Sequence, residues 1–207
     1  MVIMPSLVSP VVAAGALARL DQPVLAGPGL TLRPWRATDA SVVAAAYDEP
    51  GIRQWHSRSM TVDEALAWIG DWPQRWRREA GAGWAIVDAG GDGVNDGVDG
   101  VGGVLGQISL RSIDLAGGLA EISYWVLPEA RGRGLAAAAL GVLTEWAFGV
   151  LGLHRIEVLH STRNEASCRV AQRAGYPYEA TLRSNVLHAD GWHDMHLHAR
   201  VAGDSTA

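Results

Sequence analysis

Alternating hydrophobic and polar positions along several short segments of the chain predict β-strands. The first strand is expected over residues 30–35. Two more, over residues 84–87 and 104–110, flank a run rich in glycine and aspartate, which predicts a loop between them. The next strand is expected over residues 120–126, since Pro128 cannot continue a hydrogen-bonded ladder.

Between these predicted strands, apolar residues recur at the spacing of an α-helix, which predicts helices there. One helix is predicted over residues 38–47, followed by turn residues. Another begins after Thr61, whose hydroxyl can cap the helix while the Glu64 carboxylate reaches back. Pro73 is expected to kink this second helix.

The C-terminal half continues the alternation of helices and strands. The pattern predicts a helix over 134–149, a strand over 155–159, a helix from Asn164 to Ala174, and strands over 179–187 and 195–201 joined by a turn at 189–191. This order of elements predicts an α/β fold with one mixed sheet in a single domain. The expected organisation is an N-terminal apolar arm over residues 1–28, a domain over 29–202 and a tail over 203–207.

Composition narrows the possible functions. With 207 residues, 48% of them hydrophobic and 19% charged, the chain can build one substantial core. The formal net charge of −5 argues against a broad surface for nucleic acid. All 17 basic side chains are arginines, which excludes a mechanism that needs a catalytic lysine.

The N-terminus and the cysteine content favour a cytoplasmic protein. The first basic residue is Arg19, and Pro5 and Pro10 interrupt the apolar run before it, so the charged leader of a signal peptide is missing. The run is also too short to span a membrane. The single cysteine, Cys168, excludes an intramolecular disulfide and any multi-cysteine zinc site.

The segment after the fourth predicted strand is a candidate anion site. Residues 131–134, Arg-Gly-Arg-Gly, open directly into a helix, where free amides and the helix dipole attract anions. Glycine lets the backbone approach a ligand closely, and arginine adds charge. The segment is neither a Walker A loop nor a dinucleotide Gly-x-Gly-x-x-Gly motif. By itself it is equally consistent with an ordinary strand-to-helix turn.

Neighbouring motifs give this segment a context. Residues 121–128, followed by Arg131-x-x-Gly134-x-Ala136, resemble motif A of the GNAT superfamily of N-acetyltransferases. The helix that begins Asn164-x-x-Ser167, and the turn at residues 190–194, resemble the ribosomal-protein-alanine (RimJ/RimL-type) branch, and the similarity runs over residues 29–202. The resemblance implies a mostly antiparallel sheet flanked by helices and splayed between two central strands. It also implies direct transfer of an acyl group from acyl-CoA, with acetyl-CoA as the expected donor, to a primary amine.

The resemblance also suggests roles for individual residues. The coenzyme A site would comprise Trp125, Val126, Leu127, Arg131, Gly132, Arg133, Gly134, Leu135, Ala136, Asn164 and Ser167. Glu157 and Glu121 are candidate general bases, with Glu157 slightly favoured because it resembles a family position on its strand. Ser167 is a candidate acid for the leaving thiolate. Each of these also has a structural interpretation: a salt-bridged or rim carboxylate for the glutamates, and a first-turn serine bound to backbone amides for Ser167.

Some features remain open and others favour a structural interpretation. The acceptor is either a protein N-terminal amine or a small-molecule amine, and a non-catalytic acyl-CoA sensor is the alternative function. The chain is expected to be a monomer or homodimer, with no membrane or nucleic-acid partner. No metal is expected: Asp92, Asp96 and Asp99 fit a flexible loop better than a calcium site, and His193, His196 and His198 fit a half-exposed polar strand face better than a zinc site.

Overall fold

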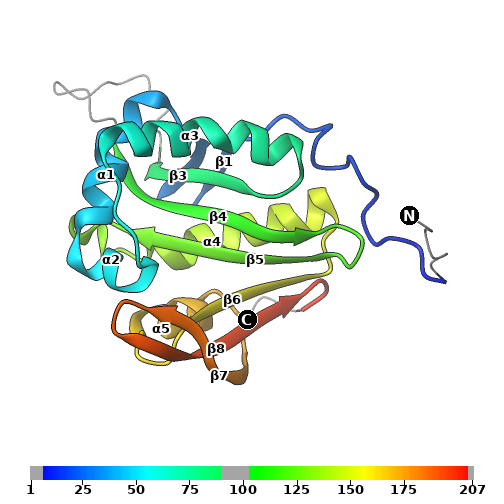
Figure 1. The fold of residues 1–207 in the computed structure, drawn as a ribbon. Coiled ribbons are helices and arrows are strands. Elements are labelled where there is room, and N and C mark those ends of the chain that lie inside the picture. The colour runs from blue at the N-terminus through cyan, green and yellow to red at the C-terminus, as the bar shows by residue number, and fades with distance from the viewer. Residues whose placement is uncertain (1–6, 90–102, 205–207) are drawn as a thin grey trace, which may run out of the picture.

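The computed structural model describes residues 7–89 and 103–204, which form a single eight-stranded mixed sheet flanked by helices (Figure 1). The sheet order is β1-β2-β3-β4-β5-β6-β8-β7, antiparallel except for the β5–β6 pair. The strands are β1 Leu25–Gly27, β2 Leu30–Pro34, β3 Ala82–Asp88, β4 Val104–Asp114, β5 Leu119–Val126, β6 Arg155–Ser161, β7 Tyr178–His188 and β8 Gly191–Val201. The predicted α/β class and mostly antiparallel sheet are confirmed.

Helices cover both faces of this sheet. They are α1 Ala40–Asp48, α2 Pro50–His56, α3 Val62–Arg77, α4 Leu135–Trp146 and α5 Glu165–Arg173, with a π-helical turn Ala147–Leu151 and 3-10 turns Ala37–Asp39 and Pro128–Ala130. One core cluster lies between the sheet and α4, and a second lies between the sheet and α1–α3. The predicted capping box of α3 is present, since the Thr61 hydroxyl accepts from the Glu64 amide and the Glu64 carboxylate accepts from the Thr61 amide. The helix continues through Pro73.

Two elements were not predicted. β1 is only three residues long and gains its hydrogen bonds entirely from β2, so it has little periodicity of its own. α2 begins at a sequence that reads as a turn, Glu49-Pro50-Gly51. The Glu49 carboxylate accepts a hydrogen bond from the Ile52 amide at 2.7 Å, and Pro50 occupies the first helical position, where its missing N–H costs nothing.

The described part of the N-terminal arm packs onto the body. Val12 and Leu17 are buried in the cluster beneath α4. The Glu79 carboxylate accepts hydrogen bonds from the amides of Gly15 at 2.7 Å, Leu17 at 2.8 Å and Ala18 at 3.2 Å. These amides hold the pKa of Glu79 below its usual value, even though desolvation acts in the opposite direction.

The expectation of a half-exposed polar face on the last strand is wrong for the C-terminal half of that strand. His198 and Arg200 of β8 are 0% and 4% exposed. Other elements cover this face: Cys168 of α5 places its sulfur 3.8 Å from His198 Nε2, and Glu145 of α4 pairs with Arg200 at 3.1 Å. The Tyr176 carbonyl accepts a hydrogen bond from His198 Nδ1. Alternation identified the residues that share the face, but only the packing of helices shows that it is buried.

The sheet splays between its two parallel strands. β5 and β6 pair only over three positions, Leu119–Glu121 with Arg155–Glu157, and beyond Glu121 they diverge while each keeps its outer neighbour (Figure 1). The predicted splay between two central strands is therefore confirmed. Beyond the last pair, both strands direct residues into the space that opens between them.

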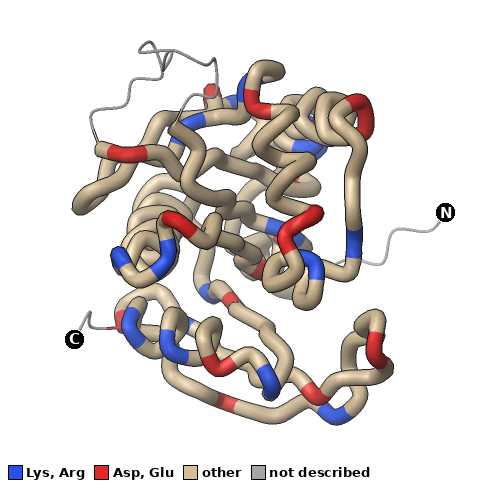
Figure 2. Tube along the Cα trace, turned by 90° about the vertical axis from the view of Figure 1, so that its left-hand side faces the viewer, with Lys and Arg blue, Asp and Glu red and all other residues tan. Residues whose placement is uncertain are grey.

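Acidic and basic positions are interspersed along the trace (Figure 2). Over residues 7–89 and 103–204, no helix is long and apolar enough to cross a membrane. The aspartates considered for a calcium loop, Asp92, Asp96 and Asp99, lie outside the described residues.

Candidate active site

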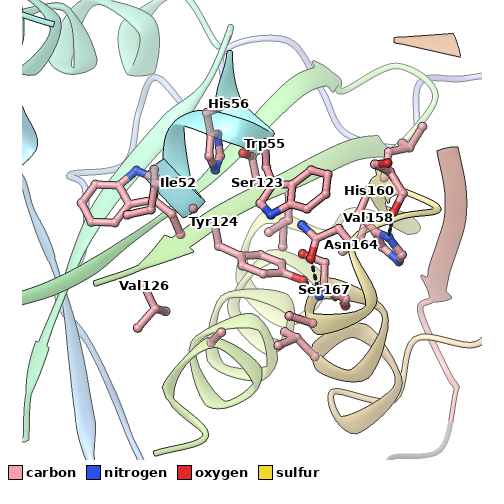
Figure 3. A pocket seen from close by; sticks show the side chains of 18 of the residues that line it. Ile52, Trp55, His56, Ser123, Tyr124, Val126, Val158, His160, Asn164 and Ser167 are labelled. Carbon is pink, nitrogen blue, oxygen red and sulfur yellow. Dashed lines mark hydrogen bonds between the residues drawn. The ribbon is translucent and has the colours of Figure 1, made fainter. Parts of the chain in front are cut away.

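A cavity of about 600 Å³ occupies the splay between β5 and β6. Its walls come from both strands, from the beginnings of α4 and α5, from α2 and from the β7–β8 hairpin (Figure 3). A volume of this size is in the range of small-molecule sites. The cavity therefore forms where two strands in the middle of the sheet diverge. Elements that are distant in sequence form the rest of its wall.

The loop before α4 presents backbone amides to this cavity. Gly132 and Gly134 both adopt φ +77°, a left-handed conformation that residues with a side chain rarely adopt. Gly134 is the N-cap of α4, and among the described residues no side chain caps this helix end. Free first-turn amides and the positive end of a helix dipole are groups that can bind an anion.

Carboxylates hold both arginines of this loop. Arg131 pairs with Glu49 at 2.9 Å and also donates from Nε to the Val126 carbonyl at 3.3 Å. Arg133 pairs with Asp88 at the end of β3. Arg131 lines the cavity and Arg133 does not, so the two arginines differ in their access to a ligand.

Side chains on the two faces of β5 pack into different core clusters. Tyr124 and Val126 pack against the cluster on the α4 side. Trp125 belongs to the cluster on the α1–α3 side, where its indole lies against Trp35 and Tyr47 at ring-centroid distances of 6.5 and 6.0 Å. Because side chains alternate along a strand, Glu121 shares the Trp125 face. Trp125 is only 3% exposed, so its ring is almost entirely buried in this cluster.

The first turn of α5 forms part of the wall next to Tyr124. The Asn164 side chain caps the helix by accepting a hydrogen bond from the Ser167 amide at 3.1 Å. The Tyr124 hydroxyl donates to the Ser167 carbonyl at 3.3 Å, and Figure 3 shows its ring pointing toward this turn. Burial raises the pKa of Tyr124 to about 12, so the phenol keeps its proton and remains a donor. Asn164 and Tyr124 together position Ser167 at the cavity.

The two candidate bases lie opposite each other at the last β5–β6 pair, but in different surroundings. Glu121 lines the cavity. Glu157 is not among the residues that line it, and its carboxylate accepts a hydrogen bond from Arg155 Nε at 2.7 Å. Arg155 also pairs with Glu179 on β7. Glu157 is thus part of an ion-pair network with Arg155 and Glu179.

Aromatic rings from α2 and the hairpin complete the other end of the cavity. Trp55 and His56 of α2 and His188 of β7 line it. His188 stacks on His193 with 4.2 Å between ring centroids, and Trp55 meets both imidazoles edge-on. Burial, followed by the positive charge of Arg58, lowers the pKa of His56 to about 4 and keeps its imidazole neutral at physiological pH.

Most of the residues that the sequence assigned to the site lie together. Those lining the cavity are Glu121, Trp125, Val126, Arg131, Gly132, Gly134, Leu135, Ala136, Asn164 and Ser167. Leu127, Arg133 and Glu157 do not line it. The Leu127 amide is bonded to the Leu105 carbonyl and its side chain joins the α1–α3 cluster. Tyr124, His160 and His188 also line the cavity and were not predicted from the sequence.

Comparison with known proteins finds one family throughout. The sequence model of the acetyltransferase (GNAT) domain matches residues 29–177. "Putative ribosomal N-acetyltransferase YdaF" of Bacillus subtilis is 36% identical over 92 residues, which cover 44% of this chain and 50% of that protein. "Uncharacterized N-acetyltransferase YoaA" of the same organism is 23% identical over 181 residues, covering 86% of this chain and 97% of that protein. The crystal structure "Mycobacterium smegmatis RimJ in complex with CoA-disulfide" superimposes with a TM-score of 0.73 at 25% identity, covering 87% of this chain and 86% of that one.

Proposed function

Because this chain belongs to the GNAT family of acetyltransferases, we propose that it transfers an acetyl group from acetyl-CoA directly to a primary amine. The observation that carries the proposal is a single cavity that joins an uncapped helix N-terminus, a carboxylate and an aromatic end wall. An anion-binding end suits the donor, and the carboxylate and the aromatic end suit an amine.

The residues present fit the phosphate part of the donor. The first-turn amides of α4 and the left-handed Gly132 and Gly134 would hold the pyrophosphate. Arg131 is half-exposed and its guanidinium keeps donors beyond those used by Glu49 and Val126, so it can add charge without breaking that pairing. Asn164 is 9% exposed at the cavity wall, where its amide group can bond the pantetheine chain.

Glu121 is the proposed general base. When bound, acetyl-CoA supplies an electrophilic thioester carbonyl and a thiolate leaving group. Glu121 faces the cavity from the same side of β5 as the α1–α3 layer, so an ammonium entering from the α2 end can give it a proton, directly or through one water. The amine nitrogen then attacks the carbonyl carbon, an amide C–N bond forms, and the C–S bond breaks. Ser167, held by Asn164 and Tyr124, is the proposed donor of the proton that the departing sulfur takes up, and the second proton that the nitrogen loses as it becomes an amide restores the serine hydroxyl through solvent.

For the acceptor we favour a protein N-terminal amine. Relatives carry names of ribosomal-protein acetyltransferases, and the cavity opens toward α2 and the β7–β8 hairpin, between which a chain end could enter. A small amine remains the second candidate because Trp55, His56 and His188 form an aromatic wall on which a flat ring or a cation could pack.

Release of free thiol from acetyl-CoA tests the proposal. The acceptors are short peptides with free N-termini, the same peptides with blocked N-termini, and a panel of small amines. Turnover with the free peptides alone supports the first acceptor class, and turnover with small amines alone supports the second. Binding of acetyl-CoA without release for any acceptor would leave a non-catalytic acyl-CoA sensor as the function.

The base assignment has its own test. Glu121→Gln should lower kcat by roughly 10²- to 10⁴-fold and remove the acidic limb of the pH–rate profile, in which the rate rises as the general base loses its proton. Glu165→Gln, on the exposed first turn of α5, is the matched control. If Glu157→Gln removes that limb and Glu121→Gln does not, the roles of the two carboxylates are reversed.

A further inference from the structure

A second cluster of reactive side chains adjoins the cavity, and one of its members, His160, also lines that cavity. His160 of β6, His196 and His198 of β8 and Cys168 of α5 each offer one possible ligand atom, and these four atoms lie within 4.8 Å of one another. His160 and His196 are direct cross-strand partners, and His198 is two residues along β8 on the same face. Cys168 approaches from the helix that covers this face. Segments far apart in sequence therefore meet here.

Hydrogen bonds to His160 and His198 indicate which nitrogen of each ring is free to bind a ligand. His160 Nδ1 donates to the Ser161 carbonyl at 2.9 Å, and His198 Nδ1 donates to the Tyr176 carbonyl at 3.0 Å. In each ring the proton is therefore on Nδ1 and the lone pair is on Nε2. Histidine ligands of metals in proteins have this arrangement, because the outer hydrogen bond orients the ring.

The inward atoms are short of partners. His160 is 5% exposed, and its Nε2 has no hydrogen-bond partner among the described residues. The same holds over this part of the chain for His196 Nδ1. The Cys168 sulfur lies 3.8 Å from His198 Nε2. A buried nitrogen lone pair that bonds to nothing is costly, unless something absent from the protein itself fills the space.

We propose that His160, Cys168, His196 and His198 bind one zinc ion. Three imidazole nitrogens and one thiolate are a donor set that zinc prefers in tetrahedral sites. At zinc–nitrogen distances of about 2.0–2.1 Å and a zinc–sulfur distance of about 2.3 Å, tetrahedral ligand atoms lie roughly 3.3–3.6 Å apart. The spacing of at most 4.8 Å thus closes onto an ion by small side-chain movements.

Four protein ligands leave no open position for water, so the site is structural and not catalytic. The position of the proposed zinc ion shows that it would stabilise the packing of α5 on the sheet. Cys168 follows Ser167 directly, and the ion would fasten the first half of α5 to β6 and β8. That half carries Asn164 and Ser167 at the cavity, so the ion would hold one wall of the active site in place.

The single cysteine makes the proposal easy to test. The full chain, with any affinity tag removed and after treatment with a chelator, is titrated with Co²⁺ as a spectroscopic probe and then with Zn²⁺. We expect one ion per chain, visible d–d bands of tetrahedral cobalt, a sulfur-to-cobalt charge-transfer band, and displacement of cobalt by zinc. A thiol reagent should modify Cys168 in the metal-free chain and much more slowly in the zinc-loaded chain, and zinc should raise Tm by mass action.

Two variants and one control distinguish this site from adventitious binding. Cys168→Ser should abolish the charge-transfer band, and His196→Gln, at a partly exposed position, should weaken zinc binding by more than the about 10- to 100-fold typical of outer-shell changes. His154→Ala, an exposed histidine outside the cluster, should leave both unchanged. Far-ultraviolet circular dichroism verifies that each variant is folded. Failure of the folded wild-type chain to bind a stoichiometric ion, or unchanged binding in both variants, would overturn the proposal.

Discussion

The loop that opens α4 can be tested at one glycine. Gly134 has φ +77°, and a β-carbon added there meets no atom within 4 Å among the described residues. Gly134→Ala therefore costs backbone strain and no steric clash, about 1–2 kcal/mol. For a chain of this size, that lowers Tm by roughly 2–8 °C.

Gly134→Glu adds a negative charge to the same strain. The new carboxylate can cap the free amides of α4 and repel a bound phosphate. For two unit charges at about 4 Å the repulsion is about 1 kcal/mol in water and about 4 kcal/mol at an effective dielectric constant of 20. We therefore expect the affinity for acetyl-CoA to fall at least about five-fold, and further as water is excluded from the site.

Gly29 provides a matched control for both changes. It has φ +74° in the turn between β1 and β2, and a β-carbon there also meets no described atom within 4 Å. Gly29→Ala and Gly29→Glu should lower Tm about as much as the changes at Gly134, while calorimetric titration with acetyl-CoA gives the wild-type affinity. If folded Gly134→Glu binds acetyl-CoA as tightly as Gly29→Glu does, α4 does not hold the pyrophosphate.

Three further predictions concern stability and protonation. Thr144→Val removes the hydroxyl that lies 2.5 Å from the buried Tyr176 hydroxyl and should lower the free energy of unfolding, measured by denaturant titration, by about 1–3 kcal/mol. Adding Tyr176→Phe removes the unpaired second hydroxyl and should recover part of that loss. A further loss in the double variant would contradict the hydrogen-bond argument. Glu79→Gln should lower Tm at neutral pH by weakening the hold on the N-terminal arm. Because folding lowers the pKa of Glu79, its carboxylate contributes stability above the usual glutamate pKa of about 4.3, and this stability is lost as pH falls through the folded pKa. The Tm difference between wild type and variant should therefore shrink in acid. A difference that does not shrink would contradict the role of the Glu79 carboxylate. His56 should titrate with a midpoint of about 4 in an NMR pH series, and a midpoint near the usual 6.5 would show that its imidazole is not desolvated beside Arg58.

The sequence by itself determined the elements whose signals are local. Thr61 and Glu64 form a capping box, Asn164 caps its helix, and Pro128 ends a strand, because each effect acts within a few residues. The order of these elements, with the loop at residues 131–134, was enough to identify the family, and the anion site at that loop stays a prediction. α2 was missed because Glu49-Pro50-Gly51 serves equally well as a turn, and the choice depends on packing.

Only the tertiary structure decided which side chains share a space. Glu121 and Glu157 are equivalent candidates in the sequence, yet Glu121 lines the cavity and Glu157 pairs with Arg155, although the two are cross-strand partners. His196 and His198 read as a polar strand face until α5 brings Cys168 against them, next to His160 of the neighbouring strand. Alternation along a strand gives the face of each side chain. What covers that face depends on contacts between segments distant in sequence, and no local pattern encodes them.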